Sequence, residues 1–341
     1  MTELQVIWFF LLGVLFVGYA ILDGFDLGVG FWHLRAKGDD ERRAMLNAVG
    51  PVWDGNEVWL LTAGGALFGA FPAVYASVFS GFYLALMLLL LVLMARAISF
   101  EFRSQTESPG WRGAWDVVFS VSSSVAILLF GVALGNILRG VPLDLSGNYL
   151  GSFWTLLNPY ALMIGVLGLA MLAFQGALYM VIKGSGELEA RARGWAAAAG
   201  YLYLALFVIA AVTSVATQGH LLENYRAVAV LWAIPVLVLA FIAGAIALHR
   251  RGQAGRAFVC SSLSIAAIWG LVGAGLFPRL VPALGAPGLS LTLANAASGE
   301  PTLKAMLIVA LFGMPLVIGY TAWVYWAFKG KVDPSHESSH Y

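Results

Sequence analysis

Long apolar stretches alternate with short polar ones along almost the whole chain. At roughly 20 residues each, nine of them could cross the hydrocarbon core of a membrane as α-helices. Most connections between them are short, so neighbouring helices should pack antiparallel. The pattern predicts an all-α, polytopic membrane bundle over residues 1–331 and a short polar tail over 332–341. The predicted spans are about 6–32, 51–71, 75–100, 113–138, 159–183, 195–218, 228–249, 257–280 and 304–328.

The composition agrees with this picture. Of the 341 residues, 60% are hydrophobic and 11% are charged, whereas a soluble domain has about 25% charged residues. The net charge of +1 indicates no acidic or basic partner, and nucleic-acid binding is not expected. Without a basic start or a cleavage site, the N-terminal segment is predicted to be a retained helix rather than a signal peptide. Cys260 lies in an apolar run and is predicted to pack there.

Lysine and arginine set the predicted orientation, because cytoplasmic loops are enriched in them. Of the 19 such residues, fifteen fall on one side of the predicted membrane. The N-terminus is therefore predicted outside, and the C-terminus and the tail in the cytoplasm. An odd number of spans also puts the two ends of the chain on opposite sides of the membrane. The four lysine and arginine residues predicted on the outer side are Arg139, Arg226, Arg279 and Lys304.

Two carboxylates interrupt the first span. Asp23 and Asp26 stand three residues apart, so they share one face of a helix, with Asp23 roughly 13 Å inside the cytoplasmic end. A charged group at the centre of a membrane helix costs about 2.5–3.5 kcal/mol on insertion scales. The pair therefore indicates a function or a compensating partner.

Acids at the start of the second span repeat the spacing. Asp54 and Glu57 lie in its first turns, and Arg96 lies near the cytoplasmic end of the third span. All of these groups map to one depth on the cytoplasmic side. We interpret them as proton-binding groups that open to the cytoplasm, with Arg96 as their counter-charge.

A simpler interpretation is that these residues are helix-end charges that reach the headgroups. We favour this interpretation for Glu101 and Asp116. For Glu57 it is as good as the interpretation as a proton-binding group. For Asp23 and Asp54 it is weaker, because short side chains cannot reach far. Helix-end anchoring is an equal alternative for Arg96.

Two pairs of glycines, Gly24 with Gly28 and Gly65 with Gly69, have the four-residue spacing that lets membrane helices approach closely. We expect them to bring the first two spans together, which would hide the acids from lipid. Packing alone also explains the glycines.

The histidines avoid the middle of the predicted membrane, where haem ligation inside a bundle would need one. His33 and His249 fall at cytoplasmic helix ends, His220 at an outer end, and His336 and His340 in the tail. No Cys/His cluster predicts a metal site, and no nucleotide-binding or hydrolase motif is present. No catalytic or cofactor-binding residue is therefore assigned to this chain.

Several segments resemble subunit II of the cytochrome bd family of quinol oxidases, including its cyanide-insensitive branch. The similarity runs from the first span to the last, and the block over 41–76 is long and specific. The segments are DGFDLGVG (23–30), ERRAMLNAVGPVWDGNEVWLLTAGGALFGAFPAVYA (41–76), FSGFY (79–83), QGA (175–177), WAIP (232–235), FVCSSL (258–263) and YTAWVYW (320–326).

The resemblance implies a respiratory complex that oxidises quinol and reduces O2 to water. It implies that b-type and d-type haems and the quinol-oxidising loop belong to a partner, subunit I, in a heterodimer of the bacterial or archaeal cytoplasmic membrane. Small single-span subunits are possible further partners. Some members also hold a structural quinone, for which no motif is identified here.

Site residues also follow from the resemblance. Asp23, Asp26 and Asp54 match acids on a cytoplasmic proton-uptake path, and Arg96 matches the arginine of the third span. Trp59 is a candidate for an oxygen route. We therefore expect a haem-free subunit of an electrogenic, non-pumping quinol:O2 oxidoreductase that supports the complex and carries protons towards the haems.

Two other functions stay open at this point. Acids within glycine-rich spans also suit a secondary transporter, although no internal repeat or pair of broken helices is evident. A purely structural subunit, in which the acids serve assembly, is the second alternative.

Overall fold

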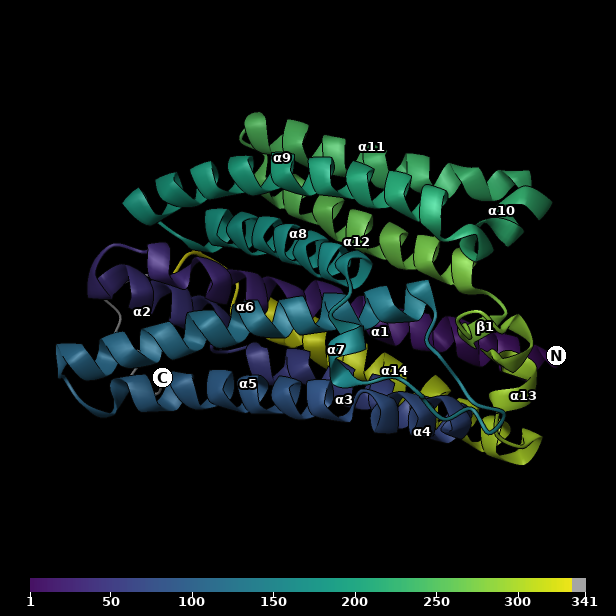
Figure 1. The fold of residues 1–341 in the computed structure, drawn as a ribbon. Helices are drawn as coiled ribbons and strands as arrows, with labels where there is room; N and C mark the ends of the chain where they lie inside the picture. The colour runs from purple at the N-terminus through teal and green to yellow at the C-terminus, as the bar shows by residue number, and fades with distance from the viewer. Residues whose placement is uncertain (333–341) are drawn as a thin grey trace.

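The long apolar runs fold as helices in the computed structural model, which describes residues 1–332 (Figure 1). A segment surrounded by lipid must satisfy its own backbone hydrogen bonds, and a helix does so locally. The prediction of an all-α membrane bundle is confirmed. The long helices are α1 Glu3–Trp32, α3 Trp53–Ala70, α5 Tyr83–Phe102, α6 Pro109–Arg139, α8 Pro159–Lys183, α9 Gly186–Thr217, α11 Ala233–Arg250, α12 Ala254–Leu276 and α14 Glu300–Ala327.

Eight of the helices in the described residues are long and apolar enough to cross a membrane. The long helix outside this set is α3, which has 18 residues and carries Asp54 and Glu57 near its start. It packs against α1 and α14 within the bundle. The exact count of nine spans and the orientation therefore stay predictions.

The predicted span over 75–100 is not one helix. It is divided between α4, which covers Pro72–Gly81, and α5, which begins at Tyr83. A side chain on Gly81 would collide with the ring of Tyr149 from a distant loop. The break thus lies where another segment packs closely against the chain.

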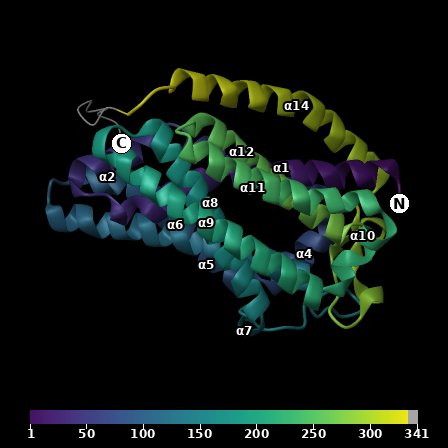
Figure 2. The same cartoon turned by 90° about the horizontal axis from the view of Figure 1, so that it is seen from above.

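The helices form two groups that meet at α8. One group contains α1, α3, α5 and α6, and the other contains α8, α9, α11 and α12. The central helix, α8, packs against α1, α6, α9 and α12. The last helix, α14, runs along the side of the bundle (Figure 2), where it contacts α3 and α1, and only Leu303 of it is buried.

Shorter elements cover the ends of the bundle. The helix α2, Gly38–Val49, lies at one end, and α10, Glu223–Ala227, lies at the other with the N-terminus (Figure 1). An antiparallel pair of short strands follows α12 at that second end, with Arg279 opposite Thr292. The remaining short elements are α7 Phe153–Leu156, α13 Leu293–Ala296, β1 Arg279–Val281, β2 Leu291–Thr292 and the 3-10 turns His33–Arg35, Arg103–Gln105, Gly219–Leu222, Ala229–Trp232 and Pro287–Leu289.

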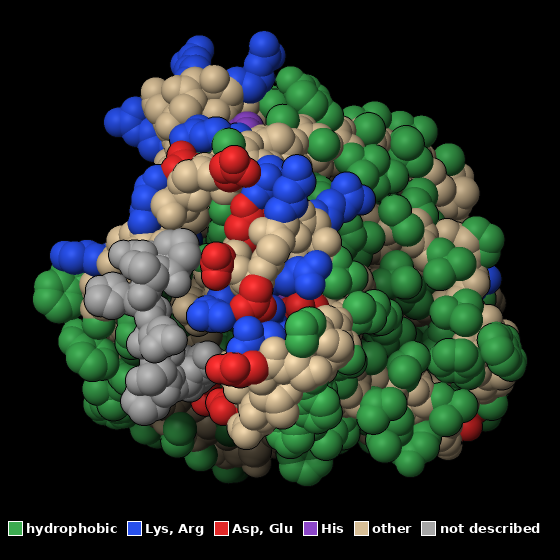
Figure 3. Space-filling model, turned by 90° about the vertical axis from the view of Figure 1, so that its left-hand side faces the viewer, with side chains coloured by type: hydrophobic (Ala, Val, Ile, Leu, Met, Phe, Trp, Pro, Cys, Tyr) green, Lys and Arg blue, Asp and Glu red, His purple; other side chains and the backbone are tan. Residues whose placement is uncertain are grey.

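Charged side chains gather at the end of the bundle where α2 lies, whereas the flanks beside it are apolar (Figure 3). This is the end that the sequence places in the cytoplasm. Apart from Val332, the predicted tail over 332–341 lies outside the described residues, and so do His336 and His340.

Glycines set the contact between α1 and α8. A side chain on Gly28 would collide with the backbone of Leu172 and Gly176, and one on Gly176 would collide with the backbone at Gly28. Gly24 likewise faces Leu172. These glycines therefore bring α1 to α8, because each helix lacks side chains where the other passes.

The expectation that the glycine pairs join the first two spans is therefore wrong. Nothing lies within contact distance of a side chain at Gly65, and one at Gly69 would meet Met306 of α14. The close approach of α1 to α3 depends instead on Gly18, which lies against the ring of Trp59.

The crossing of α1 and α8 gives a first prediction. We expect Gly28→Ala to destabilise the protein by about 1–3 kcal/mol, the usual cost of overpacking, because neither backbone can move aside without separating the helices. Thermal unfolding of the purified complex in detergent measures the loss. Gly13→Ala on the same helix is the control, since its side chain would meet nothing within 4 Å. Equal melting curves for the two variants would contradict this account.

Candidate functional site

The two aspartates of α1 lie inside the bundle. Asp23 and Asp26 are fully buried. The glycines turn one side of α1 towards α8, so the acids contact α3 and α5 on another side. Their three-residue spacing places both on one face of the helix, as the sequence predicts. The surrounding helices rather than lipid therefore decide the chemistry of both acids.

Arg96 of α5 binds the first of these acids with two hydrogen bonds. Its Nη2 donates to Oδ1 of Asp23 at 2.8 Å, and its Nη1 donates to Oδ2 at 3.1 Å. This two-point contact is the strong form of an arginine–carboxylate pair. The side chains of both residues are 0% exposed. The pair is therefore a buried ion pair between α1 and α5.

The same guanidinium also reaches α3. Its Nη1 lies 3.2 Å from Oε1 of Glu57, close enough for an ion pair but without hydrogen-bond alignment. Glu57 keeps 24% of its side chain exposed. The ring of Trp53 lies 6.0 Å from the guanidinium carbon and stacks on Phe100. Arg96 thus stands between one fully buried acid and one that reaches the protein surface.

Asp26 has a different partner, Asn56 of α3. The amide Nδ2 of Asn56 donates to Oδ2 of Asp26 at 2.8 Å. The hydroxyl of Tyr325, near the end of α14, donates to Oδ1 of Asn56 at 3.0 Å. The asparagine thus joins α1 to α14. We refer to Asp23, Asp26, Asn56, Glu57 and Arg96 together as the acid cluster.

The structure brings Asp23, Asp26, Glu57 and Arg96 together, but it places Asp54 and Trp59 at the edges of the cluster. Asp54 is exposed on α3, one turn before Glu57. Trp59 is buried beside Leu15 and Ala63.

Sequence reasoning did not identify Asn56 or Tyr325 as site residues. The sequence did contain a signal for Asn56, because it is a polar residue between Asp54 and Glu57. Tyr325 gave no signal, because aromatic residues are common at helix ends in membranes.

Polar atoms in and beside the cluster lack protein hydrogen-bond partners among residues 1–332. They are Oδ1 of Asp26, Oε1 of Glu57, Nε of Arg96, the hydroxyl of Tyr19 and Nε1 of Trp59, all buried. Buried polar atoms in proteins are nearly always hydrogen-bonded, to ordered water where no protein group is available. The cluster is therefore a site where internal water would be bound.

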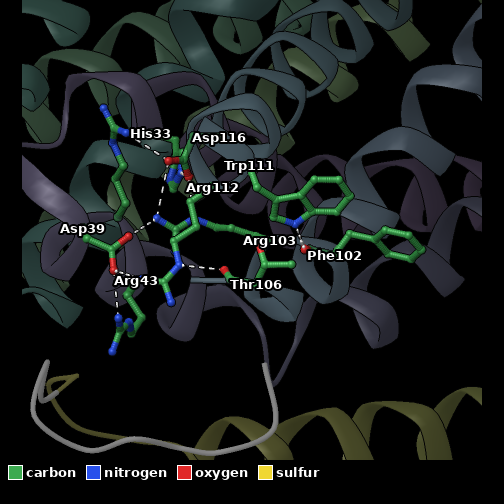
Figure 4. A network of polar contacts seen from close by, with 10 residues as sticks. His33, Asp39, Arg43, Phe102, Arg103, Thr106, Trp111, Arg112 and Asp116 are labelled. Atoms are coloured by element: carbon green, nitrogen blue, oxygen red, sulfur yellow. Dashed lines mark hydrogen bonds and ion pairs between the residues drawn. The ribbon is translucent and has the colours of Figure 1, made fainter. Parts of the chain in front are cut away.

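A second polar network lies near α2 (Figure 4). Asp116 accepts hydrogen bonds from Arg103 and Arg42 and is bonded to Nε2 of His33 at 2.6 Å. Asp39 binds the same Arg103 at 2.6 Å.

The burial of Asp116 and the exposure of Glu101 test the expectation that both are helix-end charges. Asp116 is buried, so the preferred interpretation of it as a headgroup-reaching charge is wrong, whereas Glu101 is exposed. Partial burial acts to raise the pKa of Asp39. Hydrogen bonds from Arg103 and Arg43 outweigh this effect and hold the pKa below its usual value. Asp39 therefore stays ionised at neutral pH and anchors α2 to the ends of α5 and α6.

The histidines of the described chain bind protein groups. His33 bonds to Asp116, His220 to the carbonyl of Leu138, and His249 to the carbonyl of Arg193. The cavities of about 240 and 200 Å3 contain no histidine in their walls. Residues 1–332 also contain no group of three or more His, Cys, Asp or Glu side chains that could hold a metal ion. These residues do not fit a haem.

A family model and individual relatives all identify the same family of proteins. A family model described as cytochrome bd terminal oxidase subunit II matches residues 4–328. The chain is 39% identical over 360 residues to cytochrome bd-I ubiquinol oxidase subunit 2 of Escherichia coli K12, covering 96% of this chain and 95% of the relative. It is 35% identical to cytochrome bd ubiquinol oxidase subunit 2 of Bacillus subtilis, covering 98% of each.

A solved structure has the same fold. A chain of the bd oxidase from Geobacillus thermodenitrificans aligns with a TM-score of 0.79 and 18% identity, covering 96% of this chain and 99% of that one. At this identity the likeness concerns the fold alone.

The buried ion pair gives a second prediction. Removing one member leaves a buried charge unpaired, which costs about 3–5 kcal/mol. We expect Arg96→Gln and Asp23→Asn each to lower the thermal stability of the purified complex, and the double variant to lose far less than the sum. Additive losses would show that the two side chains stabilise the fold independently.

Proposed function

The chain belongs to the cytochrome bd terminal oxidase subunit II family, and we propose that its acid cluster takes up protons for the reduction of O2. The chain is a subunit of a quinol:O2 oxidoreductase, a multi-pass protein of the bacterial inner membrane and the partner of subunit I. The observation that carries the proposal is the gathering of three carboxyl groups at the contact of α1, α3 and α5. Arg96 pairs with Asp23 and Glu57, and Asn56, the residue before Glu57, binds Asp26.

The described side chains support a division in which subunit I holds the haems and this chain carries protons. The described histidines bind protein groups, so the b-type and d-type haems are assigned to subunit I. Reducing one O2 to water consumes four protons. Taking them from the cytoplasm while quinol releases its own protons outside separates charge without a pump. This chain contributes a proton path and structural support.

The cluster suits proton uptake because of its charge. One guanidinium faces three carboxyl groups, so the cluster would carry a net charge of −2 with every acid ionised. A low-dielectric interior opposes such a charge, and each proton bound reduces it. Both carboxylate oxygens of Asp23 are occupied by its two-point contact with Arg96. Asp26 and Glu57 are therefore the groups that exchange protons, while Asp23 and Arg96 position them.

The exposure of the acids supports a path that has one end at the surface of α3. Asp26 and Asp23 are fully buried, Glu57 is partly exposed, and Asp54 is exposed on the same helix. A proton that leaves the cluster through Glu57 and Asp54 reaches the surface of α3. We infer that subunit I covers this surface and receives the proton there.

Trp59 is proposed for a different role. Its ring lies among the apolar side chains of Leu15 and Ala63, deeper in the bundle than Glu57. Apart from its Nε1, the surroundings of the ring are apolar, which favours a neutral gas over a proton. The proposal that an oxygen route passes Trp59 rests on this apolar environment and on the family resemblance.

Removing the exchanging groups gives a third prediction. In the complex with subunit I, we expect Asp26→Asn and Glu57→Gln to lower quinol-driven O2 consumption by about 100-fold, the lower limit for a positioned acid–base group. Time-resolved proton uptake should slow to the same extent, while haem content stays normal. Glu101→Gln is the control, because Glu101 is an exposed acid at the end of α5.

The outcome also decides between the proton path and a purely structural role for the acids. Normal turnover in both variants would overturn the proton path. A loss of assembled, haem-containing complex with normal activity per haem would assign the acids to assembly instead.

The exit through α3 gives a fourth prediction. Asp54→Asn should slow proton delivery to the haem site, because it removes the outermost carboxyl group of the path. Since Asp54 is exposed and Arg96 does not bind it, the melting temperature should stay unchanged. Oxygen consumption and differential scanning fluorimetry on the same sample make the comparison. Wild-type turnover in this variant would exclude Asp54 from the path.

A further inference from the structure

A cavity of about 240 Å3 lies beside the ends of α2, α8 and α14 that the sequence places in the cytoplasm. One water molecule takes up about 30 Å3 in the liquid, so the cavity has room for several. Its walls include Asn47, Tyr179, Lys183, Tyr325 and Lys331. A polar, roomy space with several hydrogen-bonding groups is one that water fills.

Tyr325 joins the cavity to the acid cluster. This residue lines the cavity, and its hydroxyl donates to Asn56, which in turn donates to Asp26. Tyr179 forms another part of the wall and is fixed in place. Its hydroxyl donates to the carbonyl of Ala48 at 3.0 Å, and its ring stacks on Phe25 at 4.1 Å. The wall between the cavity and Asp26 thus contains two phenols.

We propose that this cavity is the cytoplasmic mouth through which protons reach Asp26, and that Tyr325 and Asn56 position Asp26 to take the proton on Oδ1. The proposal rests on the proposed function, because it names the entrance to the same acid cluster. It assigns the entrance to this chain.

The directions of the hydrogen bonds support this assignment. An amide has a carbonyl that accepts and an amino group that donates, and it carries no exchangeable charge at neutral pH. Tyr325 occupies the carbonyl of Asn56, so the amino group must face Asp26. Oδ2 of Asp26 is therefore held as an acceptor, and Oδ1, which has no partner among residues 1–332, is open to a proton from water.

Three lysines line the mouth, and each has a partner. The ammonium of Lys329 lies 4.8 Å from the ring centre of Trp326. Lys331 pairs with Glu189, and Lys183 donates to the carbonyl of Phe328. Beneath them lies the acid cluster, whose carboxyl groups outnumber its one guanidinium. The resulting field attracts protons from the mouth towards Asp26.

Blocking the mouth tests the proposal. We would introduce Asn47→Cys in a Cys260→Ser background, assemble the complex with subunit I in inside-out vesicles, and add a charged methanethiosulfonate from the exposed cytoplasmic face. Labelling should lower turnover and proton uptake at least about tenfold, since it obstructs a proton-transfer route. Gln105→Cys is the control, an exposed site at the same end of the bundle but outside the cavity wall. The Cys260→Ser parent corrects for cysteines of subunit I.

A second measurement addresses the positioning residues. Tyr325→Phe frees the amide of Asn56 to rotate, so the infrared carbonyl band of protonated Asp26 should shift and proton uptake should slow. Tyr320→Phe on the exposed side of α14 should change neither. The band is assigned by its loss in Asp26→Asn.

The outcomes separate this inference from the proposed function. Full turnover in labelled Asn47→Cys, with slow uptake in Asp26→Asn, would overturn the mouth and leave the cluster in place. Normal uptake in Asp26→Asn and Glu57→Gln would overturn the proposed function itself. An unchanged infrared band in Tyr325→Phe would overturn the positioning of Asp26.

Discussion

The contact on which the site depends is the buried pair of Arg96 and Asp23. An arginine that is 0% exposed inside a membrane bundle has no water to solvate it, so its charge must be balanced by protein groups. Asp23 balances it with two hydrogen bonds, and Glu57 supplies a second carboxyl at 3.2 Å. Because these residues come from α1, α5 and α3, the charge balance also fixes how the three helices meet.

The glycines of α1 make this charge balance possible. Gly28 lets α1 lie against the backbone of α8, and Gly24 leaves room for the side chain of Leu172. The adjacent side, with Asp23 and Asp26, is then directed to α3 and α5. Tight apolar packing on one side of α1 and a polar cluster on another are thus two results of one local sequence, DGFDLG.

Hydropathy was sufficient to predict the helices, and the spacing and depth of the acids were sufficient to group Asp23, Asp26, Glu57 and Arg96. Helix periodicity tells which residues share a face, but it does not tell which neighbour that face meets. For this reason the glycines were assigned to the wrong partner, the break at Phe82 was missed, and Asp116 was expected at the surface. Tyr325 could not be found, because its partner Asn56 lies 269 residues away in the chain.

The proposed division between the subunits gives a physical reason for such a cluster in this chain. Protons used at a buried haem must cross a low-dielectric region, where an isolated charge is costly. Asp26 is linked through Asn56 to Tyr325 and the cavity on one side, and Glu57 and Asp54 lie towards the surface of α3 on the other. In the proposed path, the fixed charge of Arg96 would let a proton pass between these groups without leaving a large net charge behind. A relay in subunit II would leave the core of subunit I free for the haems, and it would make the α3 surface the place where the two subunits must fit closely.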